Sequence, residues 1–353
     1  MATAATPSSS DERSRVIALG IESTAHTFGV AVVSDKPPYI LSDARGHYRP
    51  SKGGILPREV AQYFSQVAGS VVREALSKAG VSMDDVDLIA VALGPGMGPA
   101  LRIGATVARA LSSKYSKPLY SVNHGVAHIE IARFLTGLRD PLVIYVSGGT
   151  TTIASYLEGR YRVFGETLDI ALGNLQDTFA REIGIAPPYI VGGRHVIDIC
   201  AEGGRFIEEL PYVVKGQDVS YSGLLTAAVR LVKKGWRRAD VCYTLREIAY
   251  SSVVEVAERG LAHTGKKEVV LTGGVAASKL LNEKVEAMTK SHNARFKPIP
   301  PKYAGDNGVM IALTGILAFK SGVPPIPPED AIIRQRWRLD RVDIPWYPMI
   351  LGD

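Results

Sequence analysis

The sequence predicts an α/β fold built from two similar halves. Each half opens with three consecutive strand-like segments joined by short turns, and alternating strands and helices follow. The opening strands are 15–22, 28–34 and 39–45 in the first half, and 141–147, 152–156 and 161–167 in the second. With 353 residues, the chain is long enough for two domains, each with its own core. We therefore expect an internally duplicated fold whose two subdomains enclose a cleft.

Hydrophobic periodicity places the remaining elements. In the first half it predicts helices over 58–79 and 101–113 and strands over 87–93 and 119–122. In the second half it predicts strands at 268–271 and 295–298, and helices at 174–182, 196–202, 222–234, 244–263, 276–290 and 307–320. The expected subdomains are 15–138 and 139–323. Residues 1–14 are predicted to be a disordered tail, and 324–353 a Pro-rich, basic-aromatic tail without a clear core contribution.

Composition narrows the class of protein. The hydrophobic and charged fractions, 46% and 22%, are ordinary for a soluble globular protein. No apolar run approaches the roughly 20 residues that cross a bilayer, and the polar start is not a secretory signal. Only two cysteines occur, Cys200 and Cys242, a count that excludes a disulfide framework and fits a reducing cytoplasm. We expect a cytoplasmic protein with no membrane partner.

The chain has a mild basic excess, with a net charge of +6, which permits contact with nucleic acid without requiring it. Two clusters, 233–238 and 334–338, interleave Arg or Lys with Trp. This combination suits RNA. Solvated helix ends would give the same pattern, so both interpretations stay open.

Two histidines follow the strand-like segment that ends at 122. Asn123 is placed to cap a helix, so that His124 and His128, four residues apart, lie on one face of it. Paired imidazoles suit zinc or iron and indicate a metal-assisted reaction. Capping, stacking or solvent exposure are the alternatives at this spacing. The internal Glu of His-Glu-x-x-His is missing, so a zinc protease would lack its general base.

Three tight turns follow strands, at 21–24, 147–150 and 272–274. Small residues there let backbone N–H groups approach phosphate oxygens, which predicts nucleotide binding. Glycine in such turns can equally supply the positive φ that a turn needs. The glycine-rich loop 94–102 has the wrong spacing for a dinucleotide fingerprint, and we expect a close-packed turn beside the active cleft.

Further motifs run collinearly with these features. They include Gly-Ile-Glu-Ser-Thr-Ala-His-Thr at 20–27, Gly-Pro-Gly-Met-Gly-Pro at 94–99, Tyr-Val-Ser-Gly-Gly at 145–149, Gly-Glu-Thr-Leu-Asp at 165–169, Asp-Val-Ser-Tyr-Ser-Gly at 218–223, Gly-Gly-Val-Ala-Ala at 273–277 and Asp-Asn-Gly at 306–308. Together they resemble the universal tRNA threonylcarbamoyladenosine transferase family, formerly called O-sialoglycoprotein endopeptidase. The resemblance is closest to its archaeal and eukaryotic branch and runs over 16–338.

The resemblance implies the actin, sugar-kinase and heat-shock-ATPase fold, with a nucleotide cleft. It implies transfer of a threonylcarbamoyl group from threonylcarbamoyl-AMP to N6 of the adenosine 3′ of the anticodon, in tRNAs that read codons beginning with A. It also implies partners: an atypical protein kinase and small subunits of a KEOPS-type complex. A separate synthase would make the adenylate upstream.

The resemblance also implies the site residues. One divalent metal, iron or zinc, would be held by His124, His128, Tyr145 and Asp306, and the two histidines would be catalytic. A helix cap is the alternative role for Asp306, and a place in the core is the alternative for Tyr145. The ligand would be threonylcarbamoyl-AMP or an ATP-type nucleotide. Its implied contacts are Tyr145, Ser147, Gly148, Gly149, Asp177, Gly193, Asp198, Gly273, Gly274 and Ser278.

Four positions near this implied pocket depart from the family pattern: Leu56, Thr150, Arg194 and Ser278. They keep an alternative open, a catalytically degenerate member that binds nucleotide and acts as a scaffold of the same complex. A kinase of the same fold would need carboxylates over magnesium in place of paired histidines. The weakly nucleophilic adenosine amine predicts that positioning and charge stabilisation matter more than a strong general base.

Overall fold

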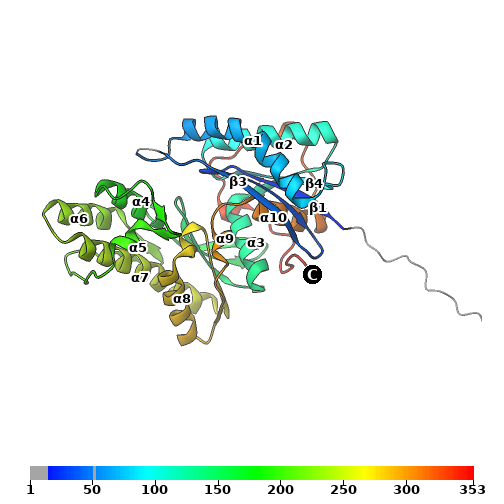
Figure 1. Cartoon of the computed structure of the whole chain (residues 1–353). Helices are drawn as coiled ribbons and strands as arrows, with labels where there is room; N and C mark the ends of the chain where they lie inside the picture. The colour runs from blue at the N-terminus through cyan, green and yellow to red at the C-terminus, as the bar shows by residue number, and fades with distance from the viewer. Residues whose placement is uncertain (1–14, 51–52) are drawn as a thin grey trace, which may run out of the picture.

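The computed structural model describes residues 15–50 and 53–353. The disordered tail predicted for 1–14 lies outside these described residues. Two five-stranded mixed sheets, one in each half of the molecule, form the framework (Figure 1). Within the described ranges, no helix has both the length and the apolar character needed to cross a membrane.

The first sheet has the strand order β3-β2-β1-β4-β5. An antiparallel meander forms one side of it, and two strands parallel to β1 form the other. The strands are β1 (Ile17–Glu22), β2 (Thr27–Ser34), β3 (Ile40–His47), β4 (Leu88–Gly94) and β5 (Leu119–Asn123). Helices α1 (Pro57–Ala79) and α2 (Gly98–Tyr115) cover one face, and α10 (Gly308–Lys320) covers the other.

The second sheet repeats this plan, with the order β8-β7-β6-β13-β14. The first three strands in sequence are again antiparallel, and the last two run parallel to β6. The strands are β6 (Leu142–Val146), β7 (Thr151–Leu157), β8 (Arg160–Glu166), β13 (Glu268–Thr272) and β14 (Arg295–Phe296). The equal order and equal directions confirm that the fold is internally duplicated.

The other elements of the second half are mostly helical. They are α4 (Leu172–Glu182), α5 (Val196–Cys200), α6 (Ser222–Lys233), α7 (Arg238–Thr264), the 3₁₀ turn Gly274–Ala277, α8 (Lys279–Ser291) and α9 (Pro301–Ala304), with the short ribbons β9 (Ile190–Val191), β10 (Arg194–His195), β11 (Val214–Lys215) and β12 (Asp218–Val219). Most bounds agree with the sequence prediction. The long helix α7 begins six residues earlier than expected, because its first turn is polar and carries little periodicity.

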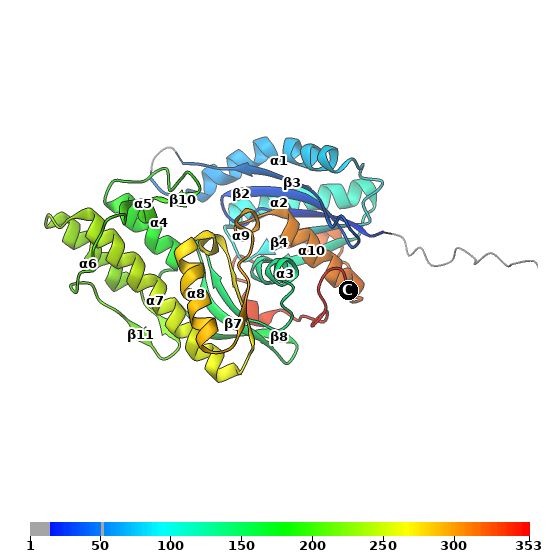
Figure 2. The ribbon, with the colours of Figure 1, turned by 60° about the horizontal axis from the view of Figure 1, so that its bottom comes forward.

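Helix α3 (His124–Thr136) joins the two halves, since it packs against α10 on one side and β13 on the other (Figures 1 and 2). Asn123 caps it as predicted: its side-chain oxygen accepts from the backbone N–H of Val126 at 3.1 Å. At the other end of the helix, Arg133 and Glu130 form a fully buried ion pair. Tyr161 on β8 donates to the same Glu130 carboxylate at 2.6 Å. Both ends of α3 are therefore fixed by polar contacts inside the core.

Helix α10 packs on the first sheet although it follows the second half in sequence. Contact is close, because a side chain at Gly20 on β1 would overlap the α10 backbone at Ala312. The subdomain limits 15–138 and 139–323 stay a prediction. The packing of α10 shows that the chain returns to the first sheet near its end.

The expectation that 324–353 makes no clear core contribution is wrong. This C-terminal segment buries Ile344, Trp346 and Leu351 and crosses both sheets. The backbone N–H of Arg334 donates to Leu93 O at the end of β4, and that of Ile344 donates to Gly159 O between β7 and β8. The segment therefore connects the two halves through its contacts with both sheets.

The two cysteines form a disulfide, so the expectation that the cysteine count indicates reduced cysteines and excludes disulfide bonding is wrong. Cys200 at the end of α5 and Cys242 in α7 are 42 positions apart in sequence, and their Cα atoms lie 5.9 Å apart. The packing of α5 against α7 brings them together. A pairing that depends on tertiary packing cannot be inferred from a count and spacing of cysteines.

Candidate active site

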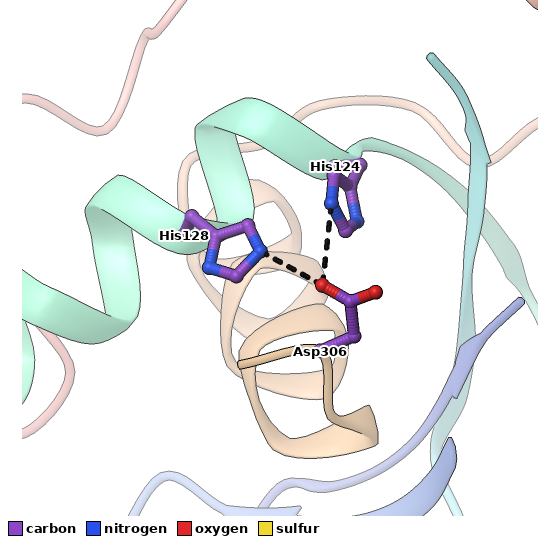
Figure 3. A group of neighbouring side chains, drawn as sticks. All are labelled: His124, His128 and Asp306. Atoms are coloured by element: carbon purple, nitrogen blue, oxygen red, sulfur yellow. Dashed lines mark hydrogen bonds and ion pairs between the residues drawn. The ribbon is translucent and has the colours of Figure 1, made fainter. Parts of the chain in front are cut away.

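The two histidines of α3 converge with Asp306 at the junction of the halves (Figure 3). His128 Nε2 lies 3.2 Å from Asp306 Oδ1, and His124 Nε2 lies 3.6 Å from the same oxygen. All three side chains are largely or fully buried. Asp306 is free for this contact because Asn307, not Asp306, caps α10 by accepting from the N–H of Met310. The alternative role of Asp306 as a helix cap is therefore excluded.

A second carboxylate, from the end of β1, lies behind the first histidine. Glu22 is fully buried and its Oε2 lies 2.9 Å from His124 Nδ1, while Thr24 Oγ1 lies 3.1 Å from the same nitrogen. This contact turns Nε2 of His124 towards Asp306. Glu22 was not among the residues predicted for the site. A glutamate at the end of an otherwise apolar strand was the available signal.

The charges of this cluster depend on one another. Burial alone lowers the pKa of His124, but the carboxylates of Glu22 and Asp306 outweigh it and raise that pKa to about 9. Burial also dominates at His128, whose pKa is lowered. Burial opposes ionisation of Asp306 as well, yet the neighbouring histidines hold its pKa below the ordinary range. Two buried carboxylates thus attract a positive charge to this point.

The donor set fits a divalent metal. Ligands bound tetrahedrally at about 2.0–2.1 Å lie roughly 3.3 Å apart, close to the two nitrogen–oxygen distances around Asp306. The carboxylate of Glu22 on the rear nitrogen of His124 is the outer-shell contact that orients a metal-binding imidazole. Nitrogen and oxygen donors suit iron and zinc alike.

Tyr145 at the end of β6 lies beside the cluster. Its ring centroid is 5.0 Å from that of His128, and the residue is only 4% exposed. Burial raises its pKa, the charge of Asp306 adds to this, and hydrogen bonding to Ser147 and Thr150 opposes it. The phenol therefore stays protonated in the absence of a cation.

Two of the predicted phosphate turns lie side by side, because β6 and β13 are parallel neighbours with Tyr145 paired to Thr272. In the first turn, Thr150 N donates to Ser147 Oγ at 3.1 Å. A side chain at Gly273 would overlap Val146 O, and its φ of +92° favours glycine. By contrast, a Cβ at Gly148, Gly149 or Gly274 would meet nothing within 4 Å. These three glycines leave room for a ligand. Glycine at 273 is instead required by its positive φ and by the close contact with Val146 O.

The other implied nucleotide contacts are engaged with protein partners. Asp177 on α4 lies 3.0 Å from His195 Nε2, and Asp198 on α5 lies 3.4 Å from an Arg246 nitrogen. Gly193 forms the exposed turn between β9 and β10. Ser278 caps α8, where its hydroxyl accepts from Leu281 N. The structure places these residues around α4, α5 and α8, separate from the metal candidates.

Three of the departing positions have partners within the fold. Thr150 closes the Ser147 turn, Ser278 caps a helix, and Arg194 pairs with Glu202 at 2.7 Å. Leu56 is 55% exposed just before α1. None of the four replaces a side chain of the His124–His128–Asp306 cluster.

The glycine-rich loop 94–99 receives the C-terminal segment. Side chains at Gly94 and Gly98 would overlap Arg334 and Gln335. A side chain at Gly96 would lie 2.6 Å from Thr24 O. The expected close-packed turn is confirmed. It packs against the loop after β1, whose Thr24 contacts His124.

A cavity of about 400 Å³ lies elsewhere, between the end of α3, α8 and β14. Gly137, Lys290 and Arg295 are among its lining residues. None of the residues predicted for the site lines it.

Comparison with known proteins agrees with the motifs. The sequence profile of the tRNA N6-adenosine threonylcarbamoyltransferase family matches residues 40–313. A protein of that name from Aeropyrum pernix is 67% identical over 338 residues, which cover 96% of this chain and 97% of the relative. Another from Hyperthermus butylicus is 60% identical over 334 residues, covering 94% and 92%.

Two solved structures share the fold at low identity. HypF of T. kodakarensis is 17% identical with a TM-score of 0.55, covering 88% of this chain and 48% of that one. Component A of the Acidaminococcus fermentans (R)-2-hydroxyglutaryl-CoA dehydratase is 14% identical with a TM-score of 0.51, covering 85% and 96%. The expected actin, sugar-kinase and heat-shock-ATPase fold is confirmed. Identity to the two archaeal relatives over nearly the whole length shows that this chain belongs to the tRNA N6-adenosine threonylcarbamoyltransferase family.

Proposed function

We propose that this chain transfers a threonylcarbamoyl group from threonylcarbamoyl-AMP to N6 of an adenosine in tRNA. The acceptor would be the adenosine 3′ of the anticodon in tRNAs that read codons beginning with A. Family membership supports the reaction. The buried His124–His128–Asp306 cluster beside two phosphate turns carries the assignment of the site.

The reaction forms a bond from adenosine N6 to the carbamoyl carbon and breaks the bond from that carbon to the phosphate oxygen. AMP leaves with the bonding electrons, and N6 loses a proton. When bound, iron or zinc supplies a Lewis acid at the donor's oxygen atoms. His124, His128, Asp306 and Tyr145 would hold it. Both cysteines are bonded to each other, which supports direct transfer without a covalent enzyme intermediate.

The residues of this chain act chiefly by positioning. Backbone N–H groups of Gly148 and Gly149 would bind the donor phosphate, because that of Ser147 already donates to Thr150 O at 2.8 Å, and the open space over the two glycines supports that role. An aromatic amine is a weak nucleophile, so positioning of N6 against the carbamoyl carbon and stabilisation of the developing charge should matter more than a strong general base. Asp177, Asp198, Gly193 and Ser278 would line the adenosine side of the donor.

We also propose the partners and the cellular location of the chain. A separate synthase would supply the adenylate upstream, as the family resemblance implies. We place the chain in the cytoplasm with tRNA, an atypical protein kinase and small subunits of a KEOPS-type complex. The family resemblance supports this set of partners.

Reconstitution tests the proposal. The chain is combined with tRNA, threonylcarbamoyl-AMP and the complex partners, and modified adenosine is measured by mass spectrometry, with bound metal measured in parallel. His124→Ala is expected to lose both metal and product, because it removes a ligand and leaves Glu22 Oε2 without the imidazole that it contacts. His292→Ala is the matched control, since this histidine pairs with Glu258 at the end of α8. Unchanged product from His124→Ala would contradict the assigned site.

A further inference from the structure

The turn between α6 and α7 concentrates positive charge. Residues 230–240 contain five basic side chains and one acidic side chain, a net charge of +4, while the whole chain carries +6. A backbone hydrogen bond from Trp236 N to Leu231 O closes the turn, so the two helix ends lie next to each other. We call residues 230–240 the α6–α7 corner. Its basic residues, all exposed, are Arg230, Lys233, Lys234, Arg237 and Arg238.

Most of these charges have no counterion within the chain. Asp240 is the acid of the corner, and it accepts from Arg237 Nη1 at 3.1 Å and from the backbone N–H of Arg205 at 2.8 Å. Glu208 and Glu209 lie further along α7, beyond the corner. Among the described residues, no carboxylate forms an ion pair with the other four basic side chains of the corner. Four exposed cations are therefore available to an anionic partner.

The loop after α5 adds a further cation to the corner. Gly204 packs against the first turn of α7, because a Cβ there would lie 2.2 Å from Ala239 O. Arg205 follows it, is exposed, and forms no ion pair in the described part of the chain. The disulfide between Cys200 and Cys242 joins the same two segments. The fold therefore fixes this loop against the corner.

Stabilisation of helix ends explains only part of this charge. Cations near the C-terminus of a helix interact favourably with its dipole, as Lys233 does on α6, whereas cations at an N-terminus oppose it. Arg237 and Arg238 stand at the N-terminus of α7, and the N-cap residue Arg237 makes no side-chain capping bond. These two arginines do not serve the helix that carries them. Such a local conflict indicates a role outside the helix.

An aromatic side chain accompanies the charges. Trp236 stands between the lysines of α6 and the arginines of α7, and 37% of it is exposed. Cations bind phosphates, and an exposed indole stacks on an unpaired base. RNA presents both groups together, whereas an acidic protein surface presents carboxylates without bases. The combination therefore favours RNA as the partner.

The corner lies far from the metal cluster. Helix α6 stands at the end of the second half, while α3, which carries His124 and His128, lies in the middle of the molecule (Figures 1 and 2). A mononucleotide bound beside the cluster does not extend to the corner. A folded tRNA does, because its phosphate backbone continues well beyond the nucleotide that reacts.

We propose that the α6–α7 corner, together with Arg205, binds a second part of the tRNA, away from the acceptor adenosine. Its cations contact phosphates, and Trp236 stacks on an unpaired base. This inference rests on the proposed function, because it takes tRNA as the substrate. The corner supplies affinity and orientation for the tRNA, while the reaction takes place at the metal cluster.

Two variants of the metal-loaded full chain test the charges and the indole separately. Binding of tRNA is measured over a series of salt concentrations. Lys233→Ala with Lys234→Ala should reduce the salt slope of log K by about 1.5–2 and weaken binding about 10–20-fold at a salt concentration of about 0.15 M, because two phosphate contacts are lost. Trp236→Ala should weaken binding about fivefold or more at an unchanged slope, because stacking releases no counterions.

Lys279→Ala with Lys290→Ala is the matched control. These exposed lysines of α8 remove the same net charge at another place on the second half. Equal losses in the control and the corner variants would overturn the inference, as would an unchanged tRNA Kd in both corner variants. Loss of the proposed protein partners at an unchanged tRNA Kd would assign the corner to a protein and overturn it as well.

The same measurements separate the corner from the proposed function. Metal content and the KM for threonylcarbamoyl-AMP should stay at the wild-type level in the corner variants, while the KM for tRNA increases. A wild type that binds tRNA but forms no modified adenosine would contradict the proposed function. The Kd comparison would still decide the role of the corner.

Discussion

The metal cluster and the phosphate turns lie side by side but are held in different ways. Every polar side chain of the cluster contacts another one, and the rear of His124 is fixed by Glu22 and Thr24. The turns instead carry glycines at 148, 149 and 274 where an added Cβ would meet nothing within 4 Å, although Gly173 of α4 packs on the backbone of Ser147 and Gly148. The protein therefore fixes the metal half largely by its own contacts, although the buried Nδ1 of His128 has no hydrogen-bond partner, and it leaves the glycines of the nucleotide half uncovered.

This difference has an energetic reason. Buried carboxylates and imidazoles are costly unless each is paired, so their partners must be in place in the folded chain. Backbone N–H groups in an open turn are satisfied by water until a phosphate arrives. We expect substitutions next to the cluster to change its metal binding. Substitutions in the turns should change mainly the binding of the nucleotide.

The largest expected effect separates the two regions through the disulfide. Cys200→Ser with Cys242→Ser should lower the free energy of unfolding by about 2–4 kcal/mol, because it releases a long loop between α5 and α7. The disulfide lies on the side of Asp198, away from α3. Metal content should therefore stay at the wild-type level while chemical denaturation shifts. Loss of metal in the double variant would show that the cluster depends on the packing of α5 against α7.

A smaller effect should appear at the rear of the cluster. Glu22→Gln keeps the size of the side chain but removes the charge behind His124, so metal affinity should fall by roughly 10–100-fold. Competition with a chromogenic chelator measures the affinity directly. Glu59→Gln, on the exposed first turn of α1, is the control. An unchanged affinity in Glu22→Gln would mean that Glu22 does not orient the ligand.

The smallest effect on stability is expected in the open turn. Gly148→Ala should change the free energy of unfolding by no more than about 0.5 kcal/mol, because its Cβ meets nothing, yet it should weaken nucleotide binding. Gly273→Ala should instead cost about 1–3 kcal/mol, since its φ is positive and its Cβ overlaps Val146 O. Thermal unfolding and nucleotide titration distinguish them. Equal loss of stability in both variants would remove the proposed difference between the turns.

Local patterns were sufficient for much of the fold. Apolar runs and periodicity predicted the strands and most helices, and the repeated opening predicted the duplication. The Asn123–His124–His128 arrangement is also local, because a cap and a spacing of four residues lie within one helix. Its bounds follow from the residues themselves.

Contacts between distant segments were not predictable in this way. Glu22 meets His124 across 102 positions, and the pairing of Cys200 with Cys242 depends on how α5 packs on α7. The role of the C-terminal segment was missed because its few apolar residues show no period. Trp346 and Leu351 are buried only because the two halves provide a surface for them.

The late position of α10 in the chain sets an order of events during synthesis. All five strands of the first sheet exist once Asn123 has been made, but the helix that covers one of its faces begins at Gly308. At about 5–20 residues per second, a ribosome needs roughly 10–40 s to make the intervening chain. Throughout that interval the face of the sheet that α10 later covers is contacted only by α3, at β4 and β5, and His124 and His128 lack Asp306. The nascent protein is therefore most prone to aggregation in its N-terminal half, which is synthesised first. The cluster can form only when translation is almost finished.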